Sequence, residues 1–240
     1  MITSLLNSGL SGKEMVLHLL CMLFAITISF SVHEFMHART AVWLGDDTPA
    51  HMGRLTLNPV AHLDPMGTVL ILIAGFGWGK PVMYNPNNLK RFKSDRAMNI
   101  MVHLAGVTGN LIVGLIGSAF LGVFTILNYK YDHVILMTMT MLFAYIVMFS
   151  LGLLAFNLLP IPPLDGFHVF EELLPYKVKM SNGYMQFQRM APMILMVVFI
   201  ASSFGRIPIL SNLVEIIETP FSYLCNLVSA LFGYLTSLVV

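Results

Sequence analysis

Residues 14–36, "EMVLHLLCMLFAITISFSVHEFM", decide the fold class of this chain. At a rise of about 1.5 Å per residue, a helix of this length crosses the hydrocarbon core of a bilayer. The rest of the chain has the same character, because 57% of its 240 residues are hydrophobic and 10% are charged, whereas soluble domains carry about 25% charged residues. The sequence therefore predicts an all-α polytopic membrane protein with the lipid bilayer as its surroundings.

Several other apolar runs are candidates for membrane segments. Four are long enough to span: residues 97–127, 133–159, 190–205 and 220–240. Two are short, 66–79 and 207–217, and the glycine-rich first one favours a re-entrant hairpin or half-helix. Pro220 is expected to separate the second short run from the last span. We expect about five to six transmembrane segments in one membrane-embedded domain over residues 1–240, with C-terminal helices at 190–240.

The basic residues predict the orientation of the chain. Three of the 13 Lys and Arg residues are Lys13, Lys130 and Arg206, and the other ten lie within residues 37–65, 80–96 and 160–189. Cytoplasmic loops accumulate Lys and Arg near span ends. If residues 66–79 re-enter, all three segments lie on the cytoplasmic side of a cell membrane. A net charge of +1 gives no basic stripe for a nucleic acid partner, and nothing in the chain indicates its oligomeric state.

The segment "GRLTLNP", residues 53–59, has a different texture from the apolar runs. Polar and apolar residues alternate from Arg54 to Asn58, and Pro59 closes the pattern. This period of two is typical of a strand. We expect a small membrane-embedded β element under the helices.

The pair His33 and His37 is the strongest chemical signal in the sequence. On a helix, residues four apart project from one face, so both imidazoles can reach one metal ion. Zinc suits such a pair, and the adjacent Glu34 can take a proton from a zinc-bound water. A chance H-E-x-x-H motif is uncommon in a chain of this length. It is less common in a membrane span, where ionisable residues are few and usually functional.

A catalytic zinc site usually takes a third protein ligand. The span at 133–159 runs back to the side where His37 lies, and it is followed by "LDG", which places Asp165 there. Alone, this triplet is more often an ordinary turn, but the histidine pair makes Asp165 the leading candidate. His62 and Asp64 are alternative ligands, with loop hydrogen bonding as the competing role.

Two more histidines are candidates for supporting roles. His103 lies in the 97–127 span, where it could line a water path, although an interhelical hydrogen bond is the favoured role. His168 follows the Asp-Gly turn and is a candidate for support of the ligand Asp165.

These motifs together resemble the site-2 protease family of intramembrane zinc metalloproteases. The resemblance is carried by "HEFMH" (33–37), "GRLTLNPVAHLDPMGT" (53–68), "LAGVTGN" (104–110) and "NLLPIPPLDG" (157–166), so that the core motifs lie within about residues 30–168. It implies one Zn²⁺ per chain held by His33, His37 and Asp165, with Glu34 as the general base. It also implies that Asn157 helps to stabilise the oxyanion, and that the "GRLTLNP" region forms a small sheet.

The sequence departs from the family pattern at one position, where Val107 replaces the proline of Ala-Gly-Pro-x-x-Asn. This affects a local kink of the helix and leaves the metal ligands in place. We expect no PDZ or CBS module, of the kind that some members carry, within these 240 residues. The resemblance implies a membrane metalloprotease that cleaves transmembrane protein substrates and releases products to the cytoplasm. A zinc transporter or channel, and a catalytically silent membrane scaffold, are the alternatives.

Overall fold

Four helices of the computed structural model are long and apolar enough to cross a membrane. They are α2 (Gly12–Leu44), α6 (Asp95–Tyr131), α7 (Val134–Asn157) and the stretch Leu210–Val239 of α11 (Ile209–Val239). The structure describes residues 9–74, 77–205 and 209–240. The all-α prediction is confirmed for this part of the chain, because every regular element in it is a helix.

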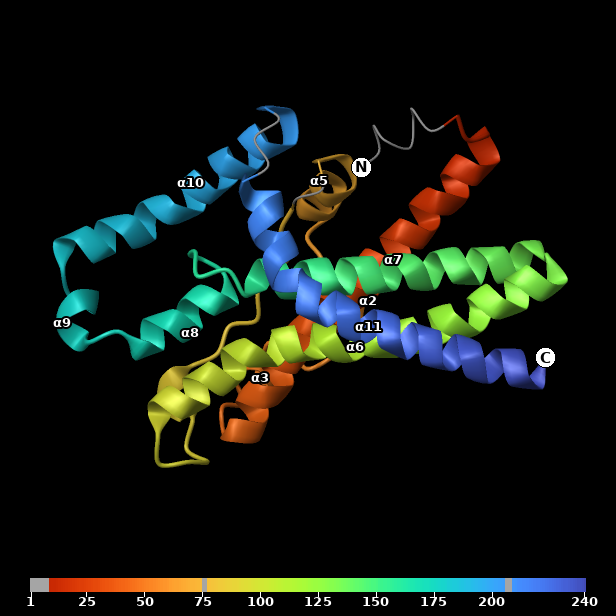
Figure 1. Ribbon diagram of the computed structural model, residues 1–240. Helices are drawn as coiled ribbons and strands as arrows, with labels where there is room; N and C mark the ends of the chain where they lie inside the picture. Colours follow the sequence, from red (N-terminus) through yellow and green to blue (C-terminus); the bar gives the residue numbers. More distant parts are fainter. Residues whose placement is uncertain (1–8, 75–76, 206–208) are drawn as a thin grey trace.

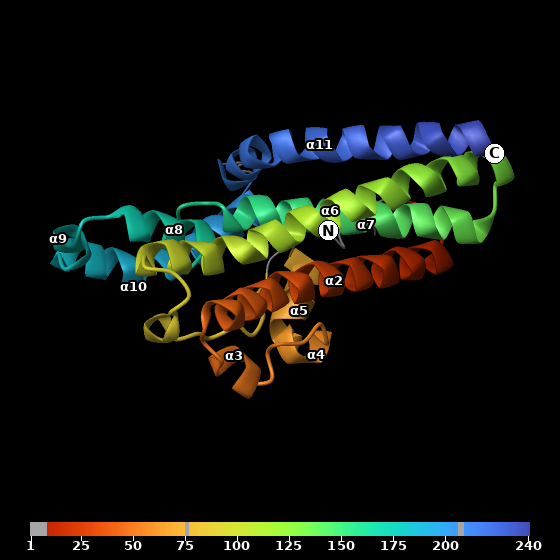
Figure 2. The ribbon, with the colours of Figure 1, turned by 90° about the horizontal axis from the view of Figure 1, so that it is seen from below.

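The four long helices form a layered bundle. Helices α6 and α7 form an antiparallel hairpin, with α2 packed on one side of it and α11 on the other (Figures 1 and 2). Near Gly122, the backbones of α6 and α11 come close, because an added Cβ there would meet the carbonyl oxygen of Ser229. The C-terminal end of α2, the start of α6 and the end of α7 lie at the same end of the bundle (Figure 2).

Shorter helices connect the long ones. They are α3 (Thr48–His51), α4 (Pro59–His62), α5 (Pro65–Ala74), η1 (Pro86–Asn88), α8 (Asp165–Leu173), α9 (Tyr176–Lys179) and α10 (Asn182–Gly205). Both views place α3, α8 and α9 at the end of the bundle where α6 begins (Figures 1 and 2). These three short helices therefore gather around one end of the long helices.

Two predicted helix boundaries are wrong. Helix α2 continues beyond residue 36 to Leu44, so His37 lies inside the helix and not at its end. Helix α11 runs through Pro220 without a break. Proline removes one backbone donor from the helix, but apolar helices tolerate this where neighbouring hydroxyl groups bond to the backbone. Here Thr219, the residue before the proline, donates to the carbonyl of Glu215 at 2.7 Å, next to the carbonyl of Ile216 that loses its donor.

The predicted count of five to six spans is not confirmed. Helix α10 covers the run at 190–205, but it begins eight residues earlier in a polar stretch and is not among the four candidates. Helix α5 has ten residues, and the chain returns beside it. Leu63 forms a β-bridge with Gly79, so the two ends of the predicted re-entrant hairpin meet. Residues 75–76 of that hairpin, and residues 207–208 of the second short run, lie outside the described residues.

The predicted strand at Arg54–Asn58 does not form in the described structure, which contains one isolated β-bridge and no sheet. The amides of this segment bond locally. The amide of Arg54 donates to Pro49 at 2.8 Å, that of Thr56 to Arg54 at 2.9 Å, and that of Asn58 to the Thr56 hydroxyl at 3.1 Å. Ser, Thr and Asn side chains compete with strand pairing in this way, which explains why the period-two pattern misled the prediction.

A buried carboxylate fixes the end of α2 to the loop that precedes α6. Asp46 is fully buried and accepts hydrogen bonds from the Asn85 amide at 2.7 Å and the Asn88 side chain at 2.9 Å. It also accepts from the Thr48 hydroxyl at 2.6 Å. Burial alone would raise the pKa of Asp46, but these hydrogen bonds hold it below its usual range. The loop is thereby held against the end of α2.

We expect Asp46→Ala to lower the free energy of unfolding by about 3 kcal/mol, because it leaves buried donors without their charged acceptor. The control is Asp47→Ala, which removes an exposed carboxylate that makes no helix-capping bond. Denaturant unfolding of the purified proteins in detergent measures both.

The difference between wild type and Asp46→Ala should depend on pH. A lowered pKa in the folded state stabilises the protein above the unfolded pKa of about 3.9, and this stabilisation is lost as the pH falls further. Equal free energies of unfolding for Asp46→Ala and its control Asp47→Ala at neutral pH would contradict the stabilising role given to Asp46.

Candidate metal centre

Two imidazoles from α2 lie close together and face α6. The Nε2 atoms of His33 and His37 are 3.0 Å apart, and the rings meet edge to face. Their exposed fractions are 4% and 8%. The histidine pair therefore points into the protein from one face of α2, as the spacing of four residues predicts.

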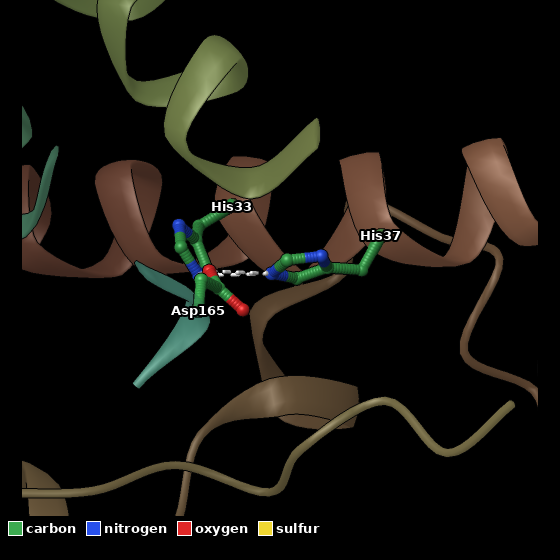
Figure 3. A group of neighbouring side chains, drawn as sticks. All are labelled: His33, His37 and Asp165. Carbon is green, nitrogen blue, oxygen red and sulfur yellow. Dashed lines mark hydrogen bonds and ion pairs between the residues drawn. The ribbon is translucent and has the colours of Figure 1, made fainter. Parts of the chain in front are cut away.

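Asp165 approaches the histidine pair from the first residue of α8. Its Oδ2 atom lies 3.3 Å from Nε2 of His33 and 3.2 Å from Nε2 of His37 (Figure 3). The turn before it is tight, because a Cβ on Gly166 would lie 2.9 Å from the carbonyl oxygen of Leu159. A larger residue than glycine at this position would force the backbone next to Asp165 to shift.

The three atoms match the ligand positions of a tetrahedral metal site. With bonds of about 2.0–2.2 Å, two ligands of a tetrahedral zinc lie about 3.3 Å apart, and the observed separations are 3.0, 3.2 and 3.3 Å. The buried Oδ2 of Asp165 accepts no hydrogen bond in the described structure, as expected for an atom that faces a cation. The residues present therefore fit a metal ion with two nitrogen ligands and one oxygen ligand.

The second nitrogen of each histidine also has a partner on α6. Nδ1 of His37 lies 2.7 Å from the carbonyl oxygen of Val102, and Nδ1 of His33 lies 3.1 Å from the side-chain amide of Asn110. Metal-ligating histidines almost always use their other nitrogen in this way, which fixes the ring orientation.

The other oxygen of Asp165 faces a second group of rings. Oδ1 lies 3.7 Å from Nδ1 of His103, whose Nε2 is 3.0 Å from the Tyr84 hydroxyl. Burial of the Asp165 carboxyl favours its neutral form, but the interactions with His37, His103 and His33 hold its pKa well below the usual range. Burial raises the pKa of Tyr84 to about 12, so its hydroxyl keeps its proton. The Asp165 carboxyl group therefore lies among three imidazoles, those of His33, His37 and His103.

Glu34 is buried beside the histidine pair. Its Oε2 accepts a hydrogen bond of 2.9 Å from the backbone amide of Val82, in the extended segment that follows the α5 hairpin. This bond holds one carboxylate oxygen and leaves Oε1 for other partners. The chain thus buries a carboxylate one residue from His33, outside the group of three ligand atoms.

Other residues considered from the sequence lie elsewhere or have different partners. His62 is buried, with Nε2 bonded to the carbonyl of Thr56 at 2.7 Å, and Asp64 accepts from the amide of Gly67 at 2.9 Å. The alternative ligands are therefore used in local loop structure. Asn157 donates to the carbonyl of Leu153 in its own helix at 2.9 Å.

His103 and His168 both lie near the ligand group. Their rings stack with centroids 4.7 Å apart, and His168 is 3.4 Å from Glu171. Burial and the neighbouring His103 lower the pKa of His168. His103 contacts the Asp165 carboxylate, and His168 stacks on the ring of His103.

Sequence reasoning did not identify four residues that shape this site: Val82, Tyr84, Gly106 and Asn110. Gly106 and Asn110 lie in the segment "LAGVTGN", which was recognised as a motif without a role for either residue. A Cβ on Gly106 would overlap Nε2 of His37 and lie 2.6 Å from Cε1 of His33. The imidazoles therefore pack against the bare backbone of α6.

Comparisons with known proteins identify a peptidase family and relatives that are named as zinc metalloproteases. A model of peptidase family M50 matches residues 66–202. YwhC of Bacillus subtilis (strain 168) is 41% identical over 162 residues, which are 66% of this chain and 71% of that protein. Rip2 of Mycobacterium tuberculosis (strain H37Rv) is 32% identical over 179 residues, or 72% of this chain and 64% of that protein. Both carry the name "Putative zinc metalloprotease". No solved structure matches the chain.

We expect Gly106→Ala to weaken binding of a divalent metal ion by about 10- to 100-fold, the range seen when groups that orient metal ligands are changed. The matched control is Gly114→Ala on the same helix, where the nearest atom to the added Cβ is 3.5 Å away. Both changes favour the helix by about 1 kcal/mol, so a loss confined to Gly106→Ala reports on the imidazoles. Chelator competition measures the affinities, and equal values for the two variants would contradict this packing.

Proposed function

Because this chain belongs to peptidase family M50, we propose that it is an intramembrane zinc metalloendopeptidase of the site-2 protease type. It hydrolyses peptide bonds in or near the transmembrane segments of membrane-anchored proteins. One observation carries this proposal: His33, His37 and Asp165 meet with ligand geometry beside the buried Glu34, within a bundle of apolar helices. The metal is zinc, one ion per chain, which suits two imidazoles and one carboxylate.

When bound, zinc polarises the scissile carbonyl and lowers the pKa of a coordinated water to about 7. His33, His37 and Asp165 would hold the metal ion at the three atoms that lie close together. Glu34 takes the proton from the attacking water at Oε1 and later delivers it to the leaving amine. The Val82 amide supports this role, because its bond to Oε2 fixes the plane of the carboxylate.

Asn157 stabilises the oxyanion that develops at the scissile carbonyl. It lies at the last residue of α7, eight residues before Asp165. One N–H of its side chain bonds to Leu153, which orients the amide group, and the other N–H is the donor to the oxyanion. This role requires the substrate carbonyl to bind between Asn157 and the metal ligands.

The reaction takes place on the cytoplasmic side of the cell membrane. The loop that leads into α6 and the region of α8 and α9 lie at one end of the bundle (Figures 1 and 2), and residues 77–94 and 165–179 contain six of the 13 Lys and Arg residues. Basic residues collect on the cytoplasmic side, and water reaches the end of a bundle at a lower cost than its centre. Residues 1–240 act as one membrane-embedded protease domain.

We expect Glu34→Gln to reduce cleavage of a single-span reporter protein by about 10²- to 10⁴-fold, the usual contribution of a general base, while zinc content stays at that of the wild type. Glu215→Gln is the control, because it makes the same chemical change at an exposed position. Purified protein in liposomes allows cleavage, bound zinc and zinc flux to be measured together.

The alternatives predict different results in these liposomes. A transporter would carry zinc across the bilayer, and a silent scaffold would leave the reporter intact even as wild type. Unchanged cleavage by Glu34→Gln would contradict the role given to Glu34.

The same liposome assay tests Asn157. We expect Asn157→Ala to lower kcat by about 10²- to 10³-fold, as removal of one oxyanion donor does elsewhere, with zinc content and KM little changed. If KM alone rises, Asn157 contributes to substrate binding and not to stabilisation of the oxyanion.

A further inference from the structure

Asn110 is a polar residue in the apolar interior of the bundle. It is fully buried on α6, one helical turn beyond Gly106. Its Nδ2 atom lies 3.1 Å from Nδ1 of His33, and its Oδ1 atom has no hydrogen-bond partner in the described structure. A buried amide costs free energy unless it is bonded, so this side chain calls for a role.

The protonation of His33 decides how the Asn110 amide must be oriented. Nε2 of His33 faces His37 and Asp165, and a metal ion at that point requires a lone pair on Nε2. The ring proton must then be on Nδ1. The N–H₂ group of Asn110 cannot accept this proton, whereas Oδ1 can. The Asn110 amide can place either its oxygen or its N–H₂ group toward His33, and the group on the other side has no protein partner in either case. The hydrogen bond to His33 therefore decides which orientation is favoured.

The second metal-binding histidine already shows the expected arrangement. Nδ1 of His37 faces the carbonyl oxygen of Val102, which is an acceptor only. Asn110 is eight residues after Val102 on the same face of α6. The carbonyl of Val102 and the carbonyl of the Asn110 side chain would then act alike, one on each imidazole.

We propose that Asn110 is a positioning residue for the metal site, whose side-chain oxygen accepts a hydrogen bond from Nδ1–H of His33. This bond keeps the proton on Nδ1 and directs the Nε2 lone pair toward the metal ion. The inference rests on the zinc site of the proposed function. It adds a residue that acts through His33 and does not touch the metal ion or the substrate.

The test uses two substitutions that separate an acceptor from a donor. Asn110→Asp keeps an oxygen acceptor and removes the N–H₂ group, and Asn110→Leu removes both while keeping the number of heavy side-chain atoms. We expect Asn110→Leu to weaken zinc binding by about 10- to 100-fold, and Asn110→Asp to bind zinc at least as tightly as the wild type. Zinc affinity is measured on the full chain in detergent by chelator competition.

A structural role is distinguished by the unfolding of the metal-free protein. The control is Ser118→Ala, which removes another buried polar group of α6 whose hydroxyl bonds to Gly114 in its own helix. We expect zinc to raise the unfolding midpoint of the wild type, Asn110→Asp and Ser118→Ala, and to raise that of Asn110→Leu less. If Asn110→Leu does not fold, the comparison of Asn110→Asp with the wild type still decides between acceptor and donor.

Weaker zinc binding by Asn110→Asp would overturn the proposal, because it would show that the N–H₂ group is needed. Wild-type affinity in Asn110→Leu would overturn it as well and leave the proposed protease function intact. A wild-type protein that binds no zinc would overturn both the protease mechanism and this inference.

Discussion

The contact between two imidazoles of α2 and the backbone of α6 is the constraint on which the site depends. His33 and His37 are four residues apart, and the groups of α6 that face them, Val102, Gly106 and Asn110, repeat at the same spacing. Because the two spacings match, the Val102 carbonyl lies at Nδ1 of His37 and the Asn110 side-chain amide lies at Nδ1 of His33. Gly106, which has no side chain, lies between them. The imidazoles are thereby fixed by packing and hydrogen bonds before a metal ion adds its own bonds.

The buried carboxylates show how this apolar bundle accommodates charge. Glu34 lies in α2 and Asp46 lies just after it. Each accepts a hydrogen bond from a backbone amide of the loop before α6: Glu34 from Val82, and Asp46 from Asn85. Asp165 comes from the connection after α7 and faces imidazoles. Charges in lipid are costly without partners, and the connecting segments at one end of the bundle provide them. The candidate metal site therefore depends on both the long helices and these segments.

Local patterns in the sequence predicted the parts of the protein that depend on local structure. The long apolar runs predicted the helices α2, α6 and α7, and the spacing of His33 and His37 placed both on one helix face. Asp165, 128 residues from His37, was predicted from the direction of the spans, and the structure brings it to the histidine pair. Its role as a ligand, like that of Glu34 and Asn157, stays a prediction.

The failures come from contacts that no local pattern contains. The segment at 54–58 alternates like a strand but has no neighbouring strand to pair with, and its amides bond locally. Gly106 and Asn110 contact the imidazoles only when α2 packs on α6.

X-ray absorption at the zinc edge of the purified protein is the most direct test of the proposed metal site. We expect one zinc ion with two imidazole nitrogens and oxygen ligands at about 2.0–2.2 Å. Sulfur ligands at about 2.3 Å, or a shell without imidazole, would contradict it.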